Sequence, residues 1–248
     1  MYFWKCWRDS KTHFILRLIV VFTLCLGVTI IIAKVEGLIG VQKGAVGPVL
    51  RTWSEATEGV LGICASLFTL FTALTLGASG VGEEFKERTA DFLLTQPRPR
   101  RYWIWTGWSV GVSELAVMAC LAVGATFGTL TYLTGHVHTW RPLATTLPLA
   151  VGGAVVYGLT YFMTVVARSG RQGLSYGIGI LFIDLLLPSV VSYYWNVNLP
   201  SVLGFMIGAC KWVTSASRAF PAGALLLWTV IALAFPVAAQ LVLERAEV

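Results

Sequence analysis

Long apolar runs separated by short polar stretches make up most of this chain. As helices, runs of roughly 18 or more residues can cross a hydrocarbon core about 30 Å thick. Backbone groups in lipid need internal partners, which favours helices, whereas a transmembrane β-barrel would show alternating segments of about ten residues. The pattern predicts six transmembrane helices, at about residues 14–33, 59–81, 105–133, 143–166, 174–191 and 222–242.

Two shorter stretches have the composition of helices at a membrane surface. Residues 1–13 combine aromatic and basic side chains, which is typical of an amphipathic helix lying at the interface. Residues 201–210 are apolar but too short to span, so we expect an interfacial or re-entrant helix there, before the last span. We therefore predict an all-α integral membrane protein with a single transmembrane domain over residues 1–248.

The composition supports this prediction and excludes several other classes of protein. Hydrophobic residues make up 56% of the chain and charged residues only 12%, with a mean hydropathy of +0.75, whereas soluble domains carry about 25% charged residues. The net charge of +6 is better explained by cytoplasmic loops than by nucleic acid. The five cysteines are odd in number and lack a CxxC spacing, so they indicate small core residues rather than disulfides.

The distribution of basic residues predicts the orientation in the membrane. Six spans place both termini on one side, together with the segment 82–101 and the turn 167–173. Most of the eighteen Lys and Arg residues belong to that side. By the positive-inside rule we expect a multi-pass protein of the plasma membrane with both termini cytoplasmic. The N-terminus lacks the cleavage site of a secretory signal, so we expect it to be retained.

The segment 82–101 is the long charged stretch of the chain. Residues 82–97 are predicted to form an amphipathic helix, because Phe85, Phe92 and Leu93 share one face at about 100° per residue. Pro97 and Pro99 should end this helix, since proline lacks the amide hydrogen and disfavours helix in the residue before it.

The order of residues in this segment also resembles a known motif. An acidic residue is followed by a threonine, a Leu-Leu pair, a proline and a basic pair: Glu84, Arg88 and Thr89, Phe92 through Pro97, and Arg100 and Arg101. This order is similar to the motif that ABC transporter permeases of type 2, the exporter class, carry after their second span. Arg88 stands where that family usually has glycine. The length, the six spans and the N-terminal helix fit the same family.

The resemblance implies a role for the 82–97 helix. It would be a coupling helix that docks in a groove of a separate ATP-binding subunit, through Glu83, Glu84, Phe85, Arg88, Thr89, Phe92 and Leu93. The chain would act as a permease subunit of an exporter, paired with an identical or a related permease chain. The GxxxxGK[ST] phosphate loop is absent, so we expect no ATPase site here, and ATP and Mg²⁺ would be bound by the partner subunit.

Two carboxylates lie deep in apolar runs, Glu114 in the third span and Asp184 in the fifth. An ionisable group inside a membrane marks a functional site by default. A structural role is the equally weighted reading, in which each carboxyl bonds to neighbouring polar groups and stabilises helix packing. His136 and His138 lack the further ligands that a metal site needs, so no metal site is predicted.

An alternative function is a secondary transporter or a channel-like protein that uses Glu114 and Asp184 as proton or ion sites. An intramembrane enzyme would need a nucleophile or metal constellation, and none is found, so no catalytic residue is predicted. Three GxxxG spacings, which permit close helix approach, are read as packing: Gly124 with Gly128, Gly173 with Gly177, and Gly204 with Gly208. The resembling family exports drugs, peptides, lipids and polysaccharides, and the sequence selects none of them.

Overall fold

The computed structural model describes residues 2–43, 63–79, 100–134, 144–195, 200–214 and 220–245. Apart from short turns and helix ends, the chain is helical in these ranges, and they contain no β-strand. The helices are α1 (Tyr2–Lys43), Ile63–Ser79, α4 (Arg100–Thr134), α6 (Thr146–Ala167), α7 (Gly170–Trp195), α8 (Val202–Thr214) and α9 (Ala222–Arg245). The predicted all-α membrane architecture is therefore seen in the part of the chain that the structure describes.

Five of these helices are long and apolar enough to cross a membrane, namely α1, α4, α6, α7 and α9. The helix Ile63–Ser79 is also apolar but shorter, and the residues on both sides of it lie outside the described ranges. Many large apolar side chains on α1, α7 and α9 are exposed in the single chain. This surface is that of a multi-pass membrane protein.

One helix, α1, is much longer than the predicted span 14–33. α1 runs without a break from Tyr2 to Lys43. The expected interfacial helix 1–13 is therefore continuous with the first span, and the loop expected from Lys34 does not begin there. This stretch holds no proline, the residue that interrupts a helix most strongly.

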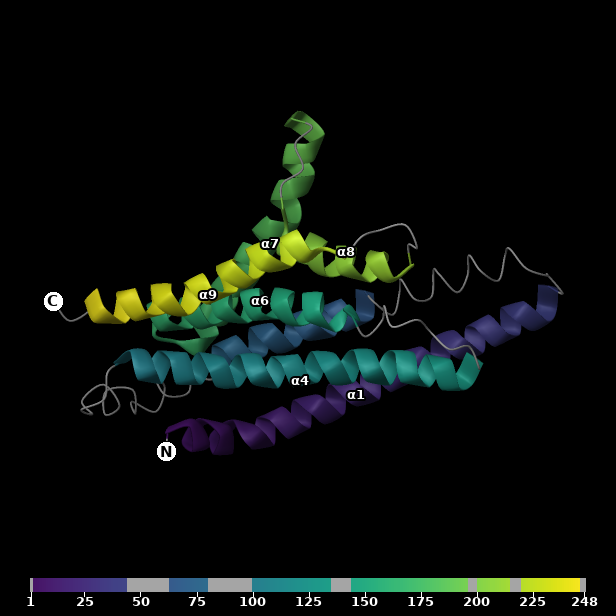
Figure 1. Cartoon of the computed structure of the whole chain (residues 1–248), viewed down its shortest axis with the longest axis horizontal. Helices are drawn as coiled ribbons and strands as arrows, with labels where there is room; N and C mark the ends of the chain where they lie inside the picture. Colours follow the sequence, from purple (N-terminus) through teal and green to yellow (C-terminus); the bar gives the residue numbers. More distant parts are fainter. Residues whose placement is uncertain are drawn as a thin grey trace.

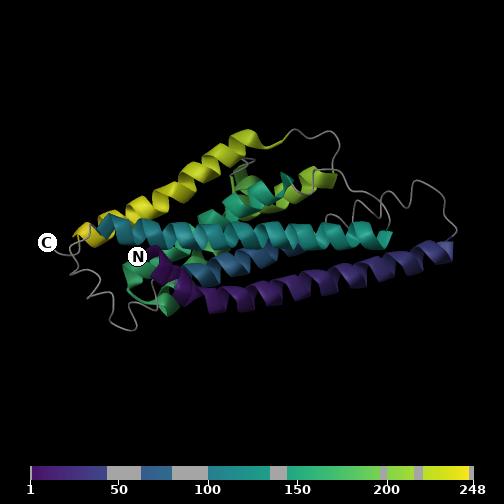
Figure 2. The same cartoon turned by 60° about the horizontal axis from the view of Figure 1, so that its bottom comes forward.

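The lengths of α1 and α4 show how far these two helices extend. At about 1.5 Å per residue, the 42 residues of α1 extend about 63 Å and the 35 residues of α4 about 52 Å. Both exceed a hydrocarbon core of about 30 Å. Figures 1 and 2 show α1 and α4 running side by side, with both helices extending past α6 at one end of the bundle.

α6 is the central helix of the bundle. In the most apolar 18-residue window of each helix, 72% of the residues are buried for α6, against 17% for α1, 11% for α7 and 22% for α9. It packs against α4, α7, α8 and α9, which surround it in Figure 1. Every other described part of the bundle is therefore positioned with reference to α6, except α1, which lies along α4.

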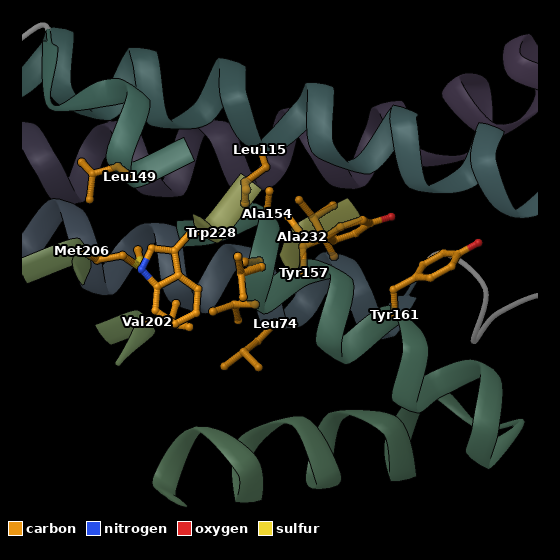
Figure 3. Packing of buried hydrophobic residues seen from close by; sticks show 14 of the residues in the cluster. Leu74, Leu115, Leu149, Ala154, Tyr157, Tyr161, Val202, Met206, Trp228 and Ala232 are labelled. Atoms are coloured by element: carbon orange, nitrogen blue, oxygen red, sulfur yellow. The ribbon is translucent and has the colours of Figure 1, made fainter. Parts of the chain in front are cut away.

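The buried core forms where the helix Ile63–Ser79, α4, α6, α8 and α9 meet, as Figure 3 shows. Met206 of α8 is fully buried and fills the space above Gly152 of α6, where a Cβ atom would collide with it. The ring of Trp228 on α9 lies 6.1 Å from that of Phe205. The predicted short helix before the last span is thus present as α8 and is packed into the bundle by its apolar face.

One end of the bundle gathers several chain ends. The first residues of α1 and α4, the last residues of α9 and the turn between α6 and α7 all lie there, on the left of Figure 1. That turn is tight because Arg168 adopts a left-handed conformation, with φ 49°, and donates its backbone N–H to the Val165 carbonyl. This left-handed cap ends α6 and lets α7 begin at Gly170.

α7 changes its surroundings along its length. Its first half packs on α6 through Gly173, Gly177 and Leu181, which are its buried residues. Its last residues stand out from the bundle at the top of Figure 1 and are exposed, including Tyr193, Tyr194 and Trp195. Pro188 lies within the helix, and it removes a backbone hydrogen bond at this place.

Candidate functional site

The predicted docking residues lie outside the described part of the chain. This holds for the whole 82–97 helix, and so for Glu83, Glu84, Phe85, Arg88, Thr89, Phe92 and Leu93. The described residues that flank this segment are Ser79, which ends the helix before it, and Arg100, which begins α4 after it. The candidate site is therefore built from the two flanks of the segment 80–99 and from the helices that hold them.

Arg17 of α1 attaches to the first flank. One of its guanidinium nitrogens donates a hydrogen bond of 3.2 Å to the Ser79 hydroxyl, and that hydroxyl lies 3.3 Å from the Leu76 carbonyl. The Arg17 side chain is half-buried against the neighbouring helix. A cation at the C-terminal end of a helix complements the partial negative charge of the free carbonyls.

α6 attaches to the same flank from another side. The Thr164 hydroxyl lies 2.8 Å from the Thr160 carbonyl of its own helix and 3.4 Å from the Gly77 carbonyl. Gly77 itself is pressed against α6, because a Cβ atom there would lie 2.8 Å from both the Tyr157 carbonyl oxygen and the Thr160 Cβ. The last turn of Ile63–Ser79 is thus held without free space.

The second flank, the first turns of α4, is also held by α6. The Tyr161 hydroxyl donates to the Ile104 carbonyl and the Tyr157 hydroxyl to the Gly107 carbonyl, each at 3.2 Å. Figure 3 shows the two tyrosines one turn apart, with their hydroxyls on the same side of α6. Gly111 makes room for Tyr157, because any Cβ there would overlap the Tyr157 ring.

Four polar residues of α6 make these contacts, and we name them the α6 polar stripe: Tyr157, Thr160, Tyr161 and Thr164. All are buried, with exposed fractions between 0% and 2%. Their spacing is i, i+3, i+4 and i+7, which places them on one helix face. Sequence reasoning missed them, although a polar stripe with helical period on an apolar span was the signal that could have found them.

α7 packs on the other side of the same residues. A Cβ atom at Gly173 would lie 2.6 Å from the Thr164 Cα, and one at Gly177 would lie 2.9 Å from the Thr160 hydroxyl. Of the predicted close-approach pairs, this one brings two helices together. Gly124, Gly128 and Gly208 face open space, and Gly204 approaches only Ser201 of its own helix end.

Asp184 caps the N-terminus of α8. Its carboxylate accepts hydrogen bonds from the Ser201 hydroxyl at 2.9 Å and from the backbone N–H groups of Val202 and Leu203 at 3.3 Å each. The first N–H groups of a helix have no partner inside the helix, so a carboxylate there can accept their hydrogen bonds. Its negative charge also interacts favourably with the positive end of the helix dipole. Ser201 also accepts from the Gly204 N–H at 3.0 Å. The structural reading of Asp184 therefore has direct support.

Glu114 lies in a different environment. It is on α4 among the buried residues, with 2% of its surface exposed. Asp184 is on α7, and the partners just described come from the start of α8. The two carboxylates thus belong to different helices, α4 and α7. Within the described ranges, no group of three or more His, Cys, Asp or Glu side chains is placed to hold a metal ion. His136 and His138 lie outside those ranges.

Among the residues whose side chains the structure describes, basic residues are distributed unevenly between the two ends of the bundle. The end that holds the two flanks carries basic side chains from four helices and one turn: Lys11, Arg17, Arg101, Arg168, Arg171 and Arg245. Lys34, near the other end of α1, is exposed on the opposite side.

A comparison of the sequence with known protein families finds no matching family model, and no curated protein matches it.

Proposed function

We propose that this chain is the permease subunit of an ATP-driven exporter of the ABC type 2 class, with six spans and both termini in the cytoplasm. It would work with a second permease chain, identical or related, and with two ATP-binding subunits that hold ATP and Mg²⁺. The second span would contain the described helix Ile63–Ser79. The chain itself would bind no nucleotide and act by mechanical coupling.

One observation carries most of this proposal. Both flanks of the segment 80–99 are tied to the central helix α6, at the end of the bundle that also gathers the chain ends and the basic side chains. Because both flanks are packed on the central helix, a push by a soluble partner on this segment would reach the buried bundle.

The mechanism follows from this arrangement. Closure of the ATP-binding subunits on nucleotide would displace the 82–97 helix. Since the second and third spans begin or end at its flanks, they would move with it. A ligand changes a conformational equilibrium only by its different affinity for the two states, so nucleotide binding must favour one arrangement of these spans. Repeated switching would open a pathway between the two permease chains alternately to each side.

The proposal is tested by changing the predicted docking face. We expect Glu84→Ala, Phe85→Ala and Phe92→Ala to reduce the amount of ATP-binding protein that co-purifies with the chain, and to lower the ATPase activity of the complex. Phe71→Ala is the matched control, because Phe71 is 67% exposed on the side of the second helix. Unchanged association in all three variants would contradict the proposal, and transport that persists without ATP but follows a proton gradient would favour a secondary transporter.

A further inference from the structure

We propose that Tyr161 and Thr164 are positioning residues that pass the movement of the segment 80–99 to α6, and through α6 to α7. The inference rests on the proposed function and adds to it the route by which movement enters the bundle. Neither residue belongs to the resembling motif or to the predicted docking face. Both were found from their contacts in the structure.

The first step of the route is that one helix holds both flanks. Thr164 reaches the Gly77 carbonyl, just before the segment, and Tyr161 donates to the Ile104 carbonyl, just after it. Tyr161 and Thr164 are three residues apart, so they lie on the same face of α6. A displacement of the segment therefore acts on two neighbouring points of one helix.

The second step is that these contacts leave no free space between the helices. Gly77 touches α6 so closely that not even a methyl group would fit, and Tyr161 is 1% exposed. Close-packed interiors transmit small displacements because side chains have no empty space into which they can move. α6 is also the most buried helix, so a shift of this helix must be shared with its neighbours.

The third step leads from α6 to α7. Gly173 packs against the backbone of Thr164, and Gly177 against the hydroxyl of Thr160. Thr164, which contacts the first flank, is thus also in contact with α7. Asp184, further along α7, holds the N-terminus of α8. Movement that reaches α7 is in this way carried to α8 as well.

The test uses the complex with its ATP-binding partner and two environment-sensitive fluorophores, one per sample, in a background without native cysteines. The upstream probe replaces Arg101, which is exposed beside the segment. The downstream probe replaces Phe182, which is 61% exposed on α7. Each fluorescence change is measured between the nucleotide-free complex and the complex with ATP and vanadate.

We expect the double variant Tyr161→Phe with Thr164→Val to keep the upstream fluorescence change. The downstream fluorescence change should become smaller by a factor of about three or more. A threefold change in the equilibrium between the two conformations corresponds to the average strength of a side-chain hydrogen bond between helices in a membrane, such as the one that Tyr161 donates to Ile104. Tyr161→Phe removes only a hydroxyl, and Thr164→Val replaces a hydroxyl with a methyl group of similar size. The control is Tyr176→Phe with Thr229→Val, since Tyr176 is exposed and Thr229 bonds only along its own helix.

The outcomes separate the two proposals. If no ATP-binding protein co-purifies, or if the upstream probe does not respond in the unmodified chain, the proposed function is wrong and this inference falls with it. If the partner binds and the upstream probe responds, but the double variant keeps the full downstream change, this inference alone is overturned. Tyr161→Phe alone, which loses one hydrogen bond, provides the same test where the double variant assembles poorly.

Discussion

Asp184 illustrates how a single residue can connect two helices of a membrane protein. Its carboxylate accepts three hydrogen bonds at the start of α8, two of them from backbone N–H groups that the helix cannot satisfy itself. A buried donor left without a partner is costly, and more so in lipid than in water. The position of α8 relative to α7 therefore depends on this side chain.

We expect Asp184→Ala to lower the free energy of unfolding by about 1–3 kcal/mol, because three donors lose their acceptor. Asp184→Asn should cost less, since the amide oxygen still accepts one of these bonds. The measurement is the melting temperature of the purified chain in detergent. Ser189→Ala is the control, because Ser189 is exposed on the same helix and bonds only to the Leu185 carbonyl. Equal melting temperatures for Asp184→Ala and the unmodified chain would show that the cap contributes nothing.

At the scale of the helices, close contact between glycine and threonine sets how α6 meets its neighbours. Helices in lipid gain little from apolar burial against one another, so small residues that allow close approach favour association. Gly77 and Gly173 lie against the backbone of α6, where no side chain can move aside. The threonine hydroxyls bond to carbonyls of their own helix, which lets them lie in an apolar environment.

This packing predicts different effects for substitutions that look alike. Gly77→Ala and Gly173→Ala should each destabilise the chain by about 1–3 kcal/mol, because the added methyl group forces two backbones apart. Gly179→Ala, on the same helix as Gly173, meets no atom within 4 Å and should be neutral or stabilise by up to about 1 kcal/mol through helix propensity. Thermal unfolding in detergent distinguishes these outcomes, and a loss of the same size at Gly179 would argue against the close-contact explanation.

At the scale of the whole molecule, the uneven charge of the bundle predicts its orientation. We expect a cysteine at Lys34 to react with a membrane-impermeant maleimide in intact cells, and a cysteine at Arg171 to react only after permeabilisation. The physical reason is that basic loops are retained on the cytoplasmic side. Both positions are exposed, so accessibility within the protein is matched, and the native cysteines are first replaced. Labelling in the opposite order would show that the topology is the reverse of the proposed one. It would then exclude a cytoplasmic partner at the flanks of the segment 80–99.

The helices were predictable to different degrees. α9 begins at the predicted residue, and α6 and α7 lie within a few residues of their predicted spans. α1 was predicted as an interfacial helix, a span and a loop, but it is one continuous helix. Hydropathy locates the apolar part of a helix and is insensitive to where the helix itself ends. The polar ends of α1 continue the helix, and they hold no proline to interrupt it.

The candidate site was only partly predictable, for a related reason. Glu114 and Asp184 attract attention because an ionisable group in an apolar run is costly. Thr164 and Tyr161 do not, since threonine and tyrosine are common in spans. Their importance depends on Gly77 and Ile104, which are far away in the sequence and become neighbours only in the bundle. The N-terminus that Asp184 caps is likewise brought to it by packing.

The sequence by itself determined that this is a helical membrane protein and where its apolar helices lie, because burial of apolar surface and satisfaction of the backbone in lipid are local requirements. The tertiary structure alone decided that α6 is the central helix, that its polar stripe holds both flanks of the segment 80–99, and that Asp184 caps α8. These depend on which helix faces meet. In a chain where nearly every face is apolar, that choice is made by a few close contacts and hydrogen bonds between residues distant in sequence.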